Sequence, residues 1–473
     1  MAASRSPSHR NNRRSAGQRG RRRNGTARGS AGRRQVRVAN QPINDGYGAI
    51  FKEGFEQGYQ LGVQTGIQRY PVPFEGTSIV IPTYNQAALV QQCIETIKWN
   101  TPEPYEIIVV DNASTDGTAA YLQKVCGEVR SRVLDKNYGF SGAINVGLMM
   151  AKGRTIVLLN NDTIVTANWL TNMLRCLNSD ERIGMVGPIT NYISGSQLVK
   201  VPYKSLREMP EFARRNNRSD PSRWRQTDKL IGFCLLFRRE LFEEVGYFDE
   251  GFEIGNYEDN DYSVRVQLLG KKLMIADDSF IHHIGSVSIK AVGDRMVKVN
   301  NQNEAFYNRK WPRIGELMES LKVHAVSRAM PAGTAALYPE RIIVRGVGAD
   351  YFWIEQGTRR LVNGVVNVPV VKVSHVDLLR WPIGEPIQAG EAERRWFGQS
   401  GADAADATTC TVKMPDGALY YIEGSTIRKL QGESALRGWS LHLKPEKTIS
   451  SDQLSRLHVG LPIIAPPVMK QSL

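Results

Sequence analysis

The chain of 473 residues lacks both a cysteine framework and a long apolar run. Its five cysteines, at positions 93, 126, 176, 234 and 410, include no Cys-x-x-Cys pair. An odd number without that spacing argues against disulfides and against a zinc site. Apolar runs such as 156–159 and 233–237 fall far short of the roughly 18–20 residues that span a membrane. A secretory signal requires an apolar segment after its N-terminal charges, and no such segment is found here. We therefore expect a soluble, cytoplasmic protein that could associate peripherally with a membrane.

Acidic residues are absent from positions 1–44, which hold twelve arginines. Without these arginines, 49 Lys and Arg residues face 47 Asp and Glu residues, so the net charge of +14 belongs to the tail. The tail has almost no large apolar residue and is expected to be disordered. It should attract an anionic partner, such as a membrane surface or a polyanion. The alternative is a solvated arm with no specific partner.

Glycines recur at every fourth residue within 45–72, at Gly54, Gly58, Gly62 and Gly66, and each precedes an apolar residue. In a helix, this repeat would place a glycine stripe beside an apolar stripe. Such a surface could pack closely against another helix in an oligomer. Four glycines cost roughly 3–4 kcal/mol relative to alanine, so a linker is an equal alternative.

Strand-like and helix-like segments alternate over 73–330, which predicts an α/β domain with a mostly parallel sheet covered by helices. After residue 331 the pattern changes to short strands and many turns. Tyr351–Arg360 resembles Leu419–Arg428, and 377–387 resembles 452–463. We interpret 331–390 as one small β module and 391–473 as a linker followed by a second copy. An exposed Trp353 or Tyr421 could stack on sugars, and the alternative is that both are core residues.

Two apolar runs in the α/β region each end in Asp and Asn residues. Glu106–Asp111 leads into Asn112, and Thr155–Leu159 leads into Asn160-Asn-Asp162. Ligands of open α/β sheets bind at the carboxyl ends of the strands. Two carboxylate-bearing strand ends at one crevice suit a nucleotide diphosphate and its divalent metal.

Candidates for the separate roles follow from side-chain chemistry. Asp111 can accept a hydrogen bond from the imide N–H of uracil or thymine, beside the strand end that carries Thr83 and Asn85; turn formation is the alternative for those two. The oxygen ligands of 160–162 suit Mg²⁺ or Mn²⁺, and a plain loop is the alternative. His283 could be a further metal ligand or a structural histidine.

A third acidic group, Glu258, Asp259 and Asp261, precedes an amphipathic helix. A general base must lie within hydrogen-bond distance of the proton that it removes. These carboxylates are candidates for that base. The alternative is that they only cap the helix and complement its dipole.

In their order along the chain, these segments resemble the inverting glycosyltransferases of family 2, which have the GT-A fold. The resemblance covers about 78–288. Its motifs are Pro82-Thr-Tyr-Asn, Val110-Asp-Asn-Ala-Ser-Thr-Asp-Gly-Thr, Asn137-Tyr-Gly-Phe-Ser-Gly-Ala-Ile-Asn, Leu159-Asn-Asn-Asp-Thr, Gly246-Tyr-Phe-Asp-Glu-Gly-Phe, Glu258-Asp-Asn-Asp-Tyr and His283-Ile-Gly-Ser. The Asn-Asn-Asp-Thr turn is similar to that of bacterial rhamnosyltransferase-like enzymes of surface polysaccharide assembly.

The resemblance implies a hexosyl- or rhamnosyltransferase that moves a sugar from a nucleotide-sugar to a hydroxyl of a glycan, lipid-linked or protein acceptor, in surface or cell-wall polysaccharide or glycoconjugate assembly. It implies Asp259 as the general base, with Glu258 beside it and Asp261 as the alternative. Asp162 would bind Mn²⁺ or Mg²⁺ with His283, although Asn160 replaces the first Asp of the family's Asp-x-Asp motif. The nucleotide-sugar would contact Pro82, Thr83, Asn85, Asp111, Asn112, Asn137, Gly139, Asn145 and Asn161.

Two other classes of protein compete with this interpretation. One is a catalytically inactive carbohydrate-binding or assembly protein on the same scaffold, against which the presence of Asp111, Asp162 and Asp259 argues. The other is a nucleotidyltransferase, which should have a Gly-rich, basic phosphate loop after the first strand. Pro82–Asn85 has no such loop.

Overall fold

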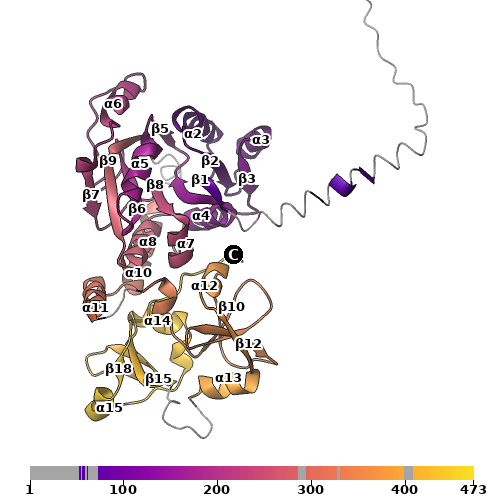
Figure 1. Ribbon diagram of the computed structural model, residues 1–473, viewed down its shortest axis with the longest axis vertical. Coiled ribbons are helices and arrows are strands. Elements are labelled where there is room, and N and C mark those ends of the chain that lie inside the picture. Colours follow the sequence, from indigo (N-terminus) through magenta and orange to yellow (C-terminus); the bar gives the residue numbers. More distant parts are fainter. Residues whose placement is uncertain are drawn as a thin grey trace, which may run out of the picture. The chain divides into compact units, whose positions relative to one another are not determined.

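A nine-stranded mixed sheet forms the centre of the first half of the chain (Figure 1). The structure is a computed structural model, and it describes residues 53–54, 56–58, 61, 73–285, 295–327, 331–398 and 409–472. The predicted tail, 1–44, lies outside the described residues. Within the glycine repeat, 53–54, 56–58 and 61 are helical and exposed, and the rest of 45–72 is not described.

The strand order of the large sheet is β3-β2-β1-β4-β8-β6-β9-β5, with β7 paired to β9. The pairs from β3 to β4 are parallel, whereas β8 is antiparallel to both β4 and β6. The strands are β1 Phe74–Thr83, β2 Tyr105–Asp111, β3 Arg130–Val133, β4 Gly153–Leu159, β5 Thr163–Val165, β6 Ile183–Thr190, β7 Trp224–Thr227, β8 Cys234–Arg238 and β9 Lys272–His283.

Helices cover both faces of this sheet, because its central strands are apolar on both sides. Along β1, Ile79 and Ile81 pack into one core and Val80 into the other. The first core includes residues of α2 and α5, and the second includes residues of α4, α7 and α8. The helices are α2 Ala87–Asn100, α3 Thr118–Lys124, α4 Gly139–Met150, α5 Trp169–Asn178, α6 Met209–Asn216, α7 Arg239–Val245, α8 Glu258–Gln267, α10 Arg295–Lys310 and α11 Ile314–Ser327.

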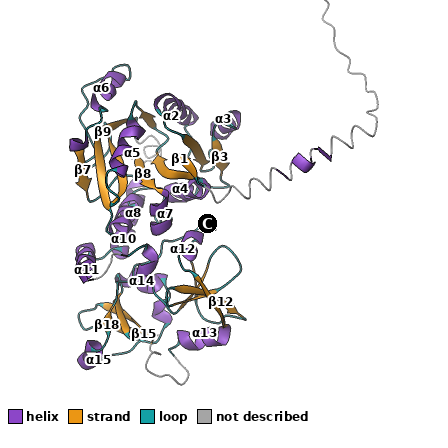
Figure 2. Cartoon of the chain, viewed as in Figure 1, coloured by secondary structure: helices purple, strands orange, loops and turns teal. Residues whose placement is uncertain are grey.

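The region after residue 331 contains two small sheets (Figure 2), of which the first has an additional strand, β13, paired with β10. In β10-β11-β12-β14 and in β15-β16-β17-β18 alike, two antiparallel pairs are followed by a parallel pair. The expected fold class, an α/β domain followed by a duplicated β module, is confirmed. The elements are β10 Ile342–Arg345, β11 Phe352–Glu355, β12 Thr358–Asn363, β13 Val370–Lys372, α12 His375–Leu379, β14 Ile383–Gln388, α13 Ala389–Trp396, β15 Thr409–Lys413, β16 Leu419–Glu423, β17 Thr426–Lys429, α14 Gly432–Gly438, α15 Ser451–Ser455 and β18 His458–Val459.

The two β modules share one apolar core with the helices that end the α/β region. This core includes Val264 of α8, Trp311 and Tyr338, together with Tyr421 from the second module. Residues 71–473 accordingly form one compact unit. The modules are therefore packed onto the α/β domain through buried side chains.

The idea that Trp353 or Tyr421 is exposed for sugar stacking is wrong. Both side chains are fully buried, and the Tyr421 hydroxyl donates to the carbonyl oxygen of Glu340 at 3.0 Å. Trp353 lies on β11 and Tyr421 on β16, at strand positions that face the interior. The alternative, that these aromatic residues are core, is correct because an inward strand position buries the largest apolar side chains.

Two local expectations about composition are also answered by the structure. All five cysteines are free thiols, as their spacing predicted. Among the described residues, no helix is both long and apolar enough to cross a membrane.

Candidate active site

The candidate site lies at the point in the sheet where successive strands are added on opposite sides. From β1 the chain adds β2 and β3 on one side of the sheet and β4 on the other, so β1 and β4 border a topological switch point. Open α/β sheets bind ligands outside the carboxyl ends of the strands at such points. Thr83 ends β1 opposite Asp111 of β2, and Asn161 follows β4.

Asp111 is fully buried and keeps one carboxylate oxygen without a partner among the described residues. Its Oδ1 accepts from the backbone N–H of Ser114 at 3.0 Å and from the Ser114 hydroxyl. Its Oδ2 has no hydrogen bond. A buried unpaired acceptor is costly, and a ligand N–H would remove the cost. Ser114 serves this carboxylate and does not cap a helix, because α3 begins only at Thr118.

Asn112 fastens the end of β2 to the segment before α4. Its Nδ2 donates to Asn137 Oδ1 and to the carbonyl oxygen of Gly139, both at 2.9 Å, and its Oδ1 accepts from Tyr138 N at 2.8 Å. Gly139 has a φ of 78°, a backbone conformation that favours glycine. The contact between Asn112 and Asn137 therefore holds the segment before α4 against the end of β2.

The strand end that carries Pro82 and Thr83 is linked directly to the end of β4. Asn161 Nδ2 donates to Thr83 Oγ1 at 2.8 Å. Pro82 lies within β1 opposite Val110. Asn85 has a φ of 59°, and its Oδ1 accepts from Thr115 N at 2.8 Å. These residues hold the two loops at the switch point together.

Asp162 and His283 meet although 121 residues separate them. The His283 Nε2 atom lies 3.0 Å from Asp162 Oδ1; Asp162 immediately precedes β5, and His283 ends β9, which pairs with β5. His283 Nδ1 lies 2.8 Å from the carbonyl oxygen of Tyr192, which can only accept, so we assign the ring proton to Nδ1. In a neutral ring with this tautomer, the Nε2 lone pair would face the carboxylate of Asp162. The imidazole also stacks on Phe233, with ring centroids 5.6 Å apart.

Two facing electron-pair donors are a suitable pair of ligands for a shared cation. A backbone acceptor on the far nitrogen is the arrangement that orients metal-binding histidines. Asn160 Oδ1 is buried without a partner among the described residues and adds an oxygen at the same turn. The described residues contain no cluster of three or more His, Cys, Asp and Glu side chains that could hold a metal. Mg²⁺ and Mn²⁺ use few protein ligands when phosphate oxygens and water complete the coordination, and the residues present fit an ion of this kind.

Asp259, on the first turn of α8, adjoins the same strand ends through Gly232. Its Oδ2 accepts from Gly232 N at 2.9 Å, and the next residue, Phe233, accepts from Asn160 N at 2.9 Å. Burial raises the pKa of Asp259, although the backbone N–H donors of Gly232 and Asn260 oppose that effect. Burial, followed by repulsion from Asp259, raises the pKa of Glu258 well above its ordinary value.

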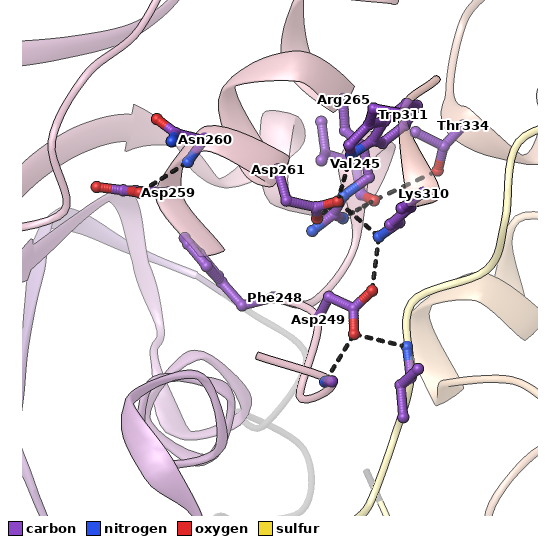
Figure 3. Close-up of polar contacts among 12 residues, drawn as sticks. Val245, Phe248, Asp249, Asp259, Asn260, Asp261, Arg265, Lys310, Trp311 and Thr334 are labelled. Carbon is purple, nitrogen blue, oxygen red and sulfur yellow. Dashed lines mark hydrogen bonds and ion pairs between the residues drawn. The ribbon is translucent and has the colours of Figure 1, made fainter. Parts of the chain in front are cut away.

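Asp261 has a different environment from Asp259 (Figure 3). Its carboxylate contacts Lys310 Nζ at 2.6 Å, Trp311 Nε1 at 2.8 Å and Arg265 Nε at 2.9 Å. Burial alone would raise its pKa, but the charges of Lys310 and Arg265 hold the pKa below the ordinary value. Asp261 is therefore ionised and fully occupied inside the protein, which argues against its role as the alternative base.

Asn145 is also occupied within the protein. It is fully buried, with Nδ2 donating to the carbonyl oxygen of Phe248 at 2.9 Å and to Glu250 Oε1 at 3.0 Å, and Oδ1 accepting from Phe248 N at 2.8 Å. These contacts fasten α4 to the segment before α8. These internal hydrogen bonds argue against a contact of Asn145 with a nucleotide-sugar.

Sequence reasoning missed several residues that complete the site. Gly232 supplies the N–H that binds Asp259, Tyr192 orients His283, and Lys310 fixes Asp261. Gly232 and Tyr192 act through backbone groups, which any residue has, so their types carry no signal. Lys310 ends a helical stretch as an ordinary basic residue, and only its burial marks it.

With this geometry, residues 78–246 match the model of the family described as "Glycosyl transferase family 2". This segment is a glycosyltransferase family 2 domain. The acidic cluster of α8 and His283 lie beyond the matched residues, yet the structure joins them to its strand ends.

Curated relatives of this glycosyltransferase family 2 domain include a chondroitin synthase of Pasteurella multocida, 27% identical over 238 residues, which cover 44% of this chain and 24% of the relative. An N-acetylglucosaminyl-diphospho-decaprenol L-rhamnosyltransferase of Mycobacterium tuberculosis is 26% identical over 245 residues, 43% of this chain and 75% of the relative. The chain spans less than half the length of the first two relatives. Among solved structures, a mannosyltransferase of Pyrobaculum calidifontis in complex with GDP-Man and Mn²⁺ has a TM-score of 0.34 and 20% identity, covering 60% of this chain and 88% of that one.

Proposed function

We propose that the protein is a divalent-metal-dependent, inverting glycosyltransferase that moves a hexosyl or rhamnosyl group from a nucleotide-sugar to an acceptor hydroxyl. The proposal rests on three chemically distinct groups that lie near one another at the carboxyl ends of the strands. Asp111 presents a free buried acceptor, Asp162 and His283 present a pair of metal ligands, and Asp259 joins them through Gly232.

Each group has a role in the proposed reaction. Asp111 Oδ2 accepts a hydrogen bond from an imide N–H of the base, which favours uracil or thymine. Asp162 and His283 would hold Mn²⁺ or Mg²⁺, which as a Lewis acid stabilises the charge of the leaving diphosphate. Asp259 takes the proton of the acceptor hydroxyl as that oxygen attacks the anomeric carbon. The bond to the diphosphate breaks on the opposite side, so the configuration inverts.

The buried position of Asp259 supports its role as the base. A pKa raised by burial makes this carboxylate a stronger base than an exposed Asp, while its hydrogen bonds to Gly232 and Asn260 fix its direction. Burial, followed by the charge of Asp259, raises the pKa of Glu258 well above its ordinary value, which favours the protonated form of this neighbour. The two adjacent carboxyl groups thus have separate roles.

The proposal extends to the kind of pathway and to the acceptor. The names of the relatives, a chondroitin synthase and a rhamnosyltransferase of a decaprenol-linked sugar, favour assembly of a polysaccharide or a lipid-linked glycan. The acceptor is accordingly a glycan, a lipid-linked sugar or a glycosylated protein. An anionic partner for the tail and an oligomer formed through 47–70 are further proposals that rest on sequence alone.

A donor screen tests the function. The full chain is incubated with UDP-, dTDP- and GDP-sugars and with Mn²⁺ or Mg²⁺, and release of the nucleoside diphosphate is measured. We expect one donor class to be consumed, with turnover lowered about 10²- to 10⁴-fold in Asp259→Asn and strongly lowered in Asp162→Ala.

Asp350→Asn, at an exposed position in the first β module, is the matched control and should keep full turnover. Full activity in both site variants would overturn the mechanism. The anomeric configuration of the product, read by proton NMR, tests inversion separately.

A further inference from the structure

The segment between α7 and α8, residues 246–257, has an unusual backbone. Ile254, Asn256 and Tyr257 have φ values of 59°, 79° and 75°, in a region that L-residues rarely adopt. A β-branched residue such as Ile254 is especially disfavoured there. Such conformations persist only where surrounding contacts enforce them. Tyr257 immediately precedes Glu258 and Asp259, so whatever holds this segment also sets the start of α8.

Asn303 of α10 makes four hydrogen bonds to the backbone of this segment. Its Nδ2 donates to the carbonyl oxygens of Glu253 and Gly255 at 2.9 Å and of Asn256 at 3.1 Å, and its Oδ1 accepts from Glu253 N at 3.0 Å. Its side chain is almost completely buried. One side chain thus binds three carbonyl oxygens and one N–H of this segment.

Lys310, seven residues further along α10, links Asp249 of this segment to Asp261 of α8. Its Nζ lies 2.6 Å from Asp249 Oδ2 and 2.6 Å from Asp261 Oδ1, with all three side chains buried (Figure 3). Positions i and i+7 of a helix lie on one face. Phe306 lies between them on α10 and packs edge-on against Phe252, with ring centroids 4.9 Å apart.

The last described residues of the chain bind the same segment. Val468 N donates to Asp249 Oδ1 at 3.0 Å, and Glu250 N donates to the carbonyl oxygen of Val468 at 2.9 Å. The Glu250 carboxylate accepts from Lys470 N at 2.6 Å and from Gln471 N at 3.0 Å. The C-terminal residues therefore cover the side of residues 249–250 that α10 leaves free.

We propose that Asn303, Lys310 and Val468–Gln471 form a brace that positions Asp259 for catalysis. None of these residues reaches the proposed reacting atoms, so they are positioning residues. The inference rests on the proposed function. It goes beyond that function because α10 and the C-terminal residues lie outside the family 2 match at 78–246.

The brace assigns a role to the C-terminal half of the chain. The segment 246–257 also contacts α4, because Phe140 N donates to the carbonyl oxygen of Ile254 at 2.8 Å. A shift of the segment would therefore move Asp259 with respect to the donor side of the site. Displacements of about 1 Å can lower a rate about 100-fold.

Asn303→Ala tests the brace in the full chain, with Asn301→Ala at an exposed position of α10 as the matched control. We expect kcat to fall about 10- to 100-fold in Asn303→Ala, with the KM for the nucleotide-sugar unchanged. A chain ending at residue 467 should show the same fall in kcat at an unchanged KM, and a chain ending at residue 471 should not. Wild-type kcat in both Asn303→Ala and the shorter chain would overturn the proposal.

Amide hydrogen exchange gives a readout that is independent of activity. We expect faster exchange over 249–262 in Asn303→Ala and in the chain ending at 467, with no change over 105–112. Unchanged exchange over 249–262 in both would overturn the brace even if no donor were found. Absence of turnover in the wild-type protein, together with the expected exchange, would instead overturn only the proposed function. If Asn303→Ala fails to fold, the chain ending at 467 decides.

Discussion

The two sides of the candidate site are built differently. The donor side, Thr83, Asp111–Asn112 and Asn160–Asp162, lies at strand ends and leaves two buried oxygens, Asp111 Oδ2 and Asn160 Oδ1, without partners among the described residues. On the base side, Asp249, Glu250 and Asp261 are bound by groups that lie about 50 to 220 residues away. The base side also contains buried oxygens without partners among the described residues, Glu258 Oε2 and Asn260 Oδ1, but the carboxylates around Asp259 are held by distant groups.

This difference separates binding from positioning. A site that receives a nucleotide and an ion needs unpaired acceptors, whose desolvation the ligand offsets. A general base needs a fixed direction and a tuned pKa, and both come from packing. We therefore expect changes on the base side to affect stability and kcat, and changes on the donor side to affect the KM for the donor.

The largest expected effect follows from removing the charge of Lys310. Lys310→Met leaves the buried carboxylates of Asp249 and Asp261 without their shared ammonium partner. We expect a loss of about 3–5 kcal/mol in the free energy of unfolding, because breaking a buried ion pair strands its charges. Urea denaturation measures the loss. Lys298→Met, at an exposed position of α10, is the control and should change stability little. Equal stabilities of the two variants would contradict the contrast between the sides.

A smaller effect is expected from Asn112→Ala on the donor side. The change removes the hydrogen bonds to Asn137, Tyr138 and Gly139. We expect stability to fall by about 2 kcal/mol, with a raised KM for the nucleotide-sugar and a nearly unchanged kcat. Thermal unfolding and steady-state kinetics measure these quantities. A fall in kcat at constant KM would mean that the donor side also positions the base.

The smallest expected effect concerns pH. Asp259 must be ionised to accept a proton, and burial raises its pKa, so kcat/KM should rise with pH through a value above the ordinary 3.8. Lys229, an exposed residue, partly opposes this increase by its charge. Lys229→Met should therefore shift the acid limb slightly to higher pH, as measured by a pH–rate profile. A shift to lower pH would contradict the assignment of Asp259.

The ionisation of Asp259 affects stability in the opposite direction to its effect on activity. A pKa raised on folding favours the protonated form, so its contribution to stability is present at low pH and is lost as the pH rises through the raised value. For Asp261 the pKa is lowered, so its contribution is present at neutral pH and is lost as the pH falls. Activity therefore requires Asp259 in the form that destabilises the fold.

Much of the site could be predicted from sequence where function depends on local patterns. The ends of β1, β2 and β4 carry the expected polar residues because apolar runs and Asn/Asp clusters are short-range features. The hydrogen bond from Ser114 to Asp111 joins neighbouring residues, but its effect on the free carboxylate oxygen is visible only in the folded chain. Asp261 and Asn145 were assigned to catalysis and ligand binding, but distant residues occupy them.

The sequence by itself determined the alternation of strands and helices, the duplication of the β module and the polar strand ends, because periodicity and turn composition are written in neighbouring residues. Only the tertiary structure shows that Asp261 is paired with Lys310 and Arg265 whereas Asp259 accepts from backbone N–H groups. That difference depends on Gly232 and Lys310, which no local pattern connects to α8. Burial and charge pairing are properties of the assembled fold, and they shift the pKa values of these two similar side chains in opposite directions.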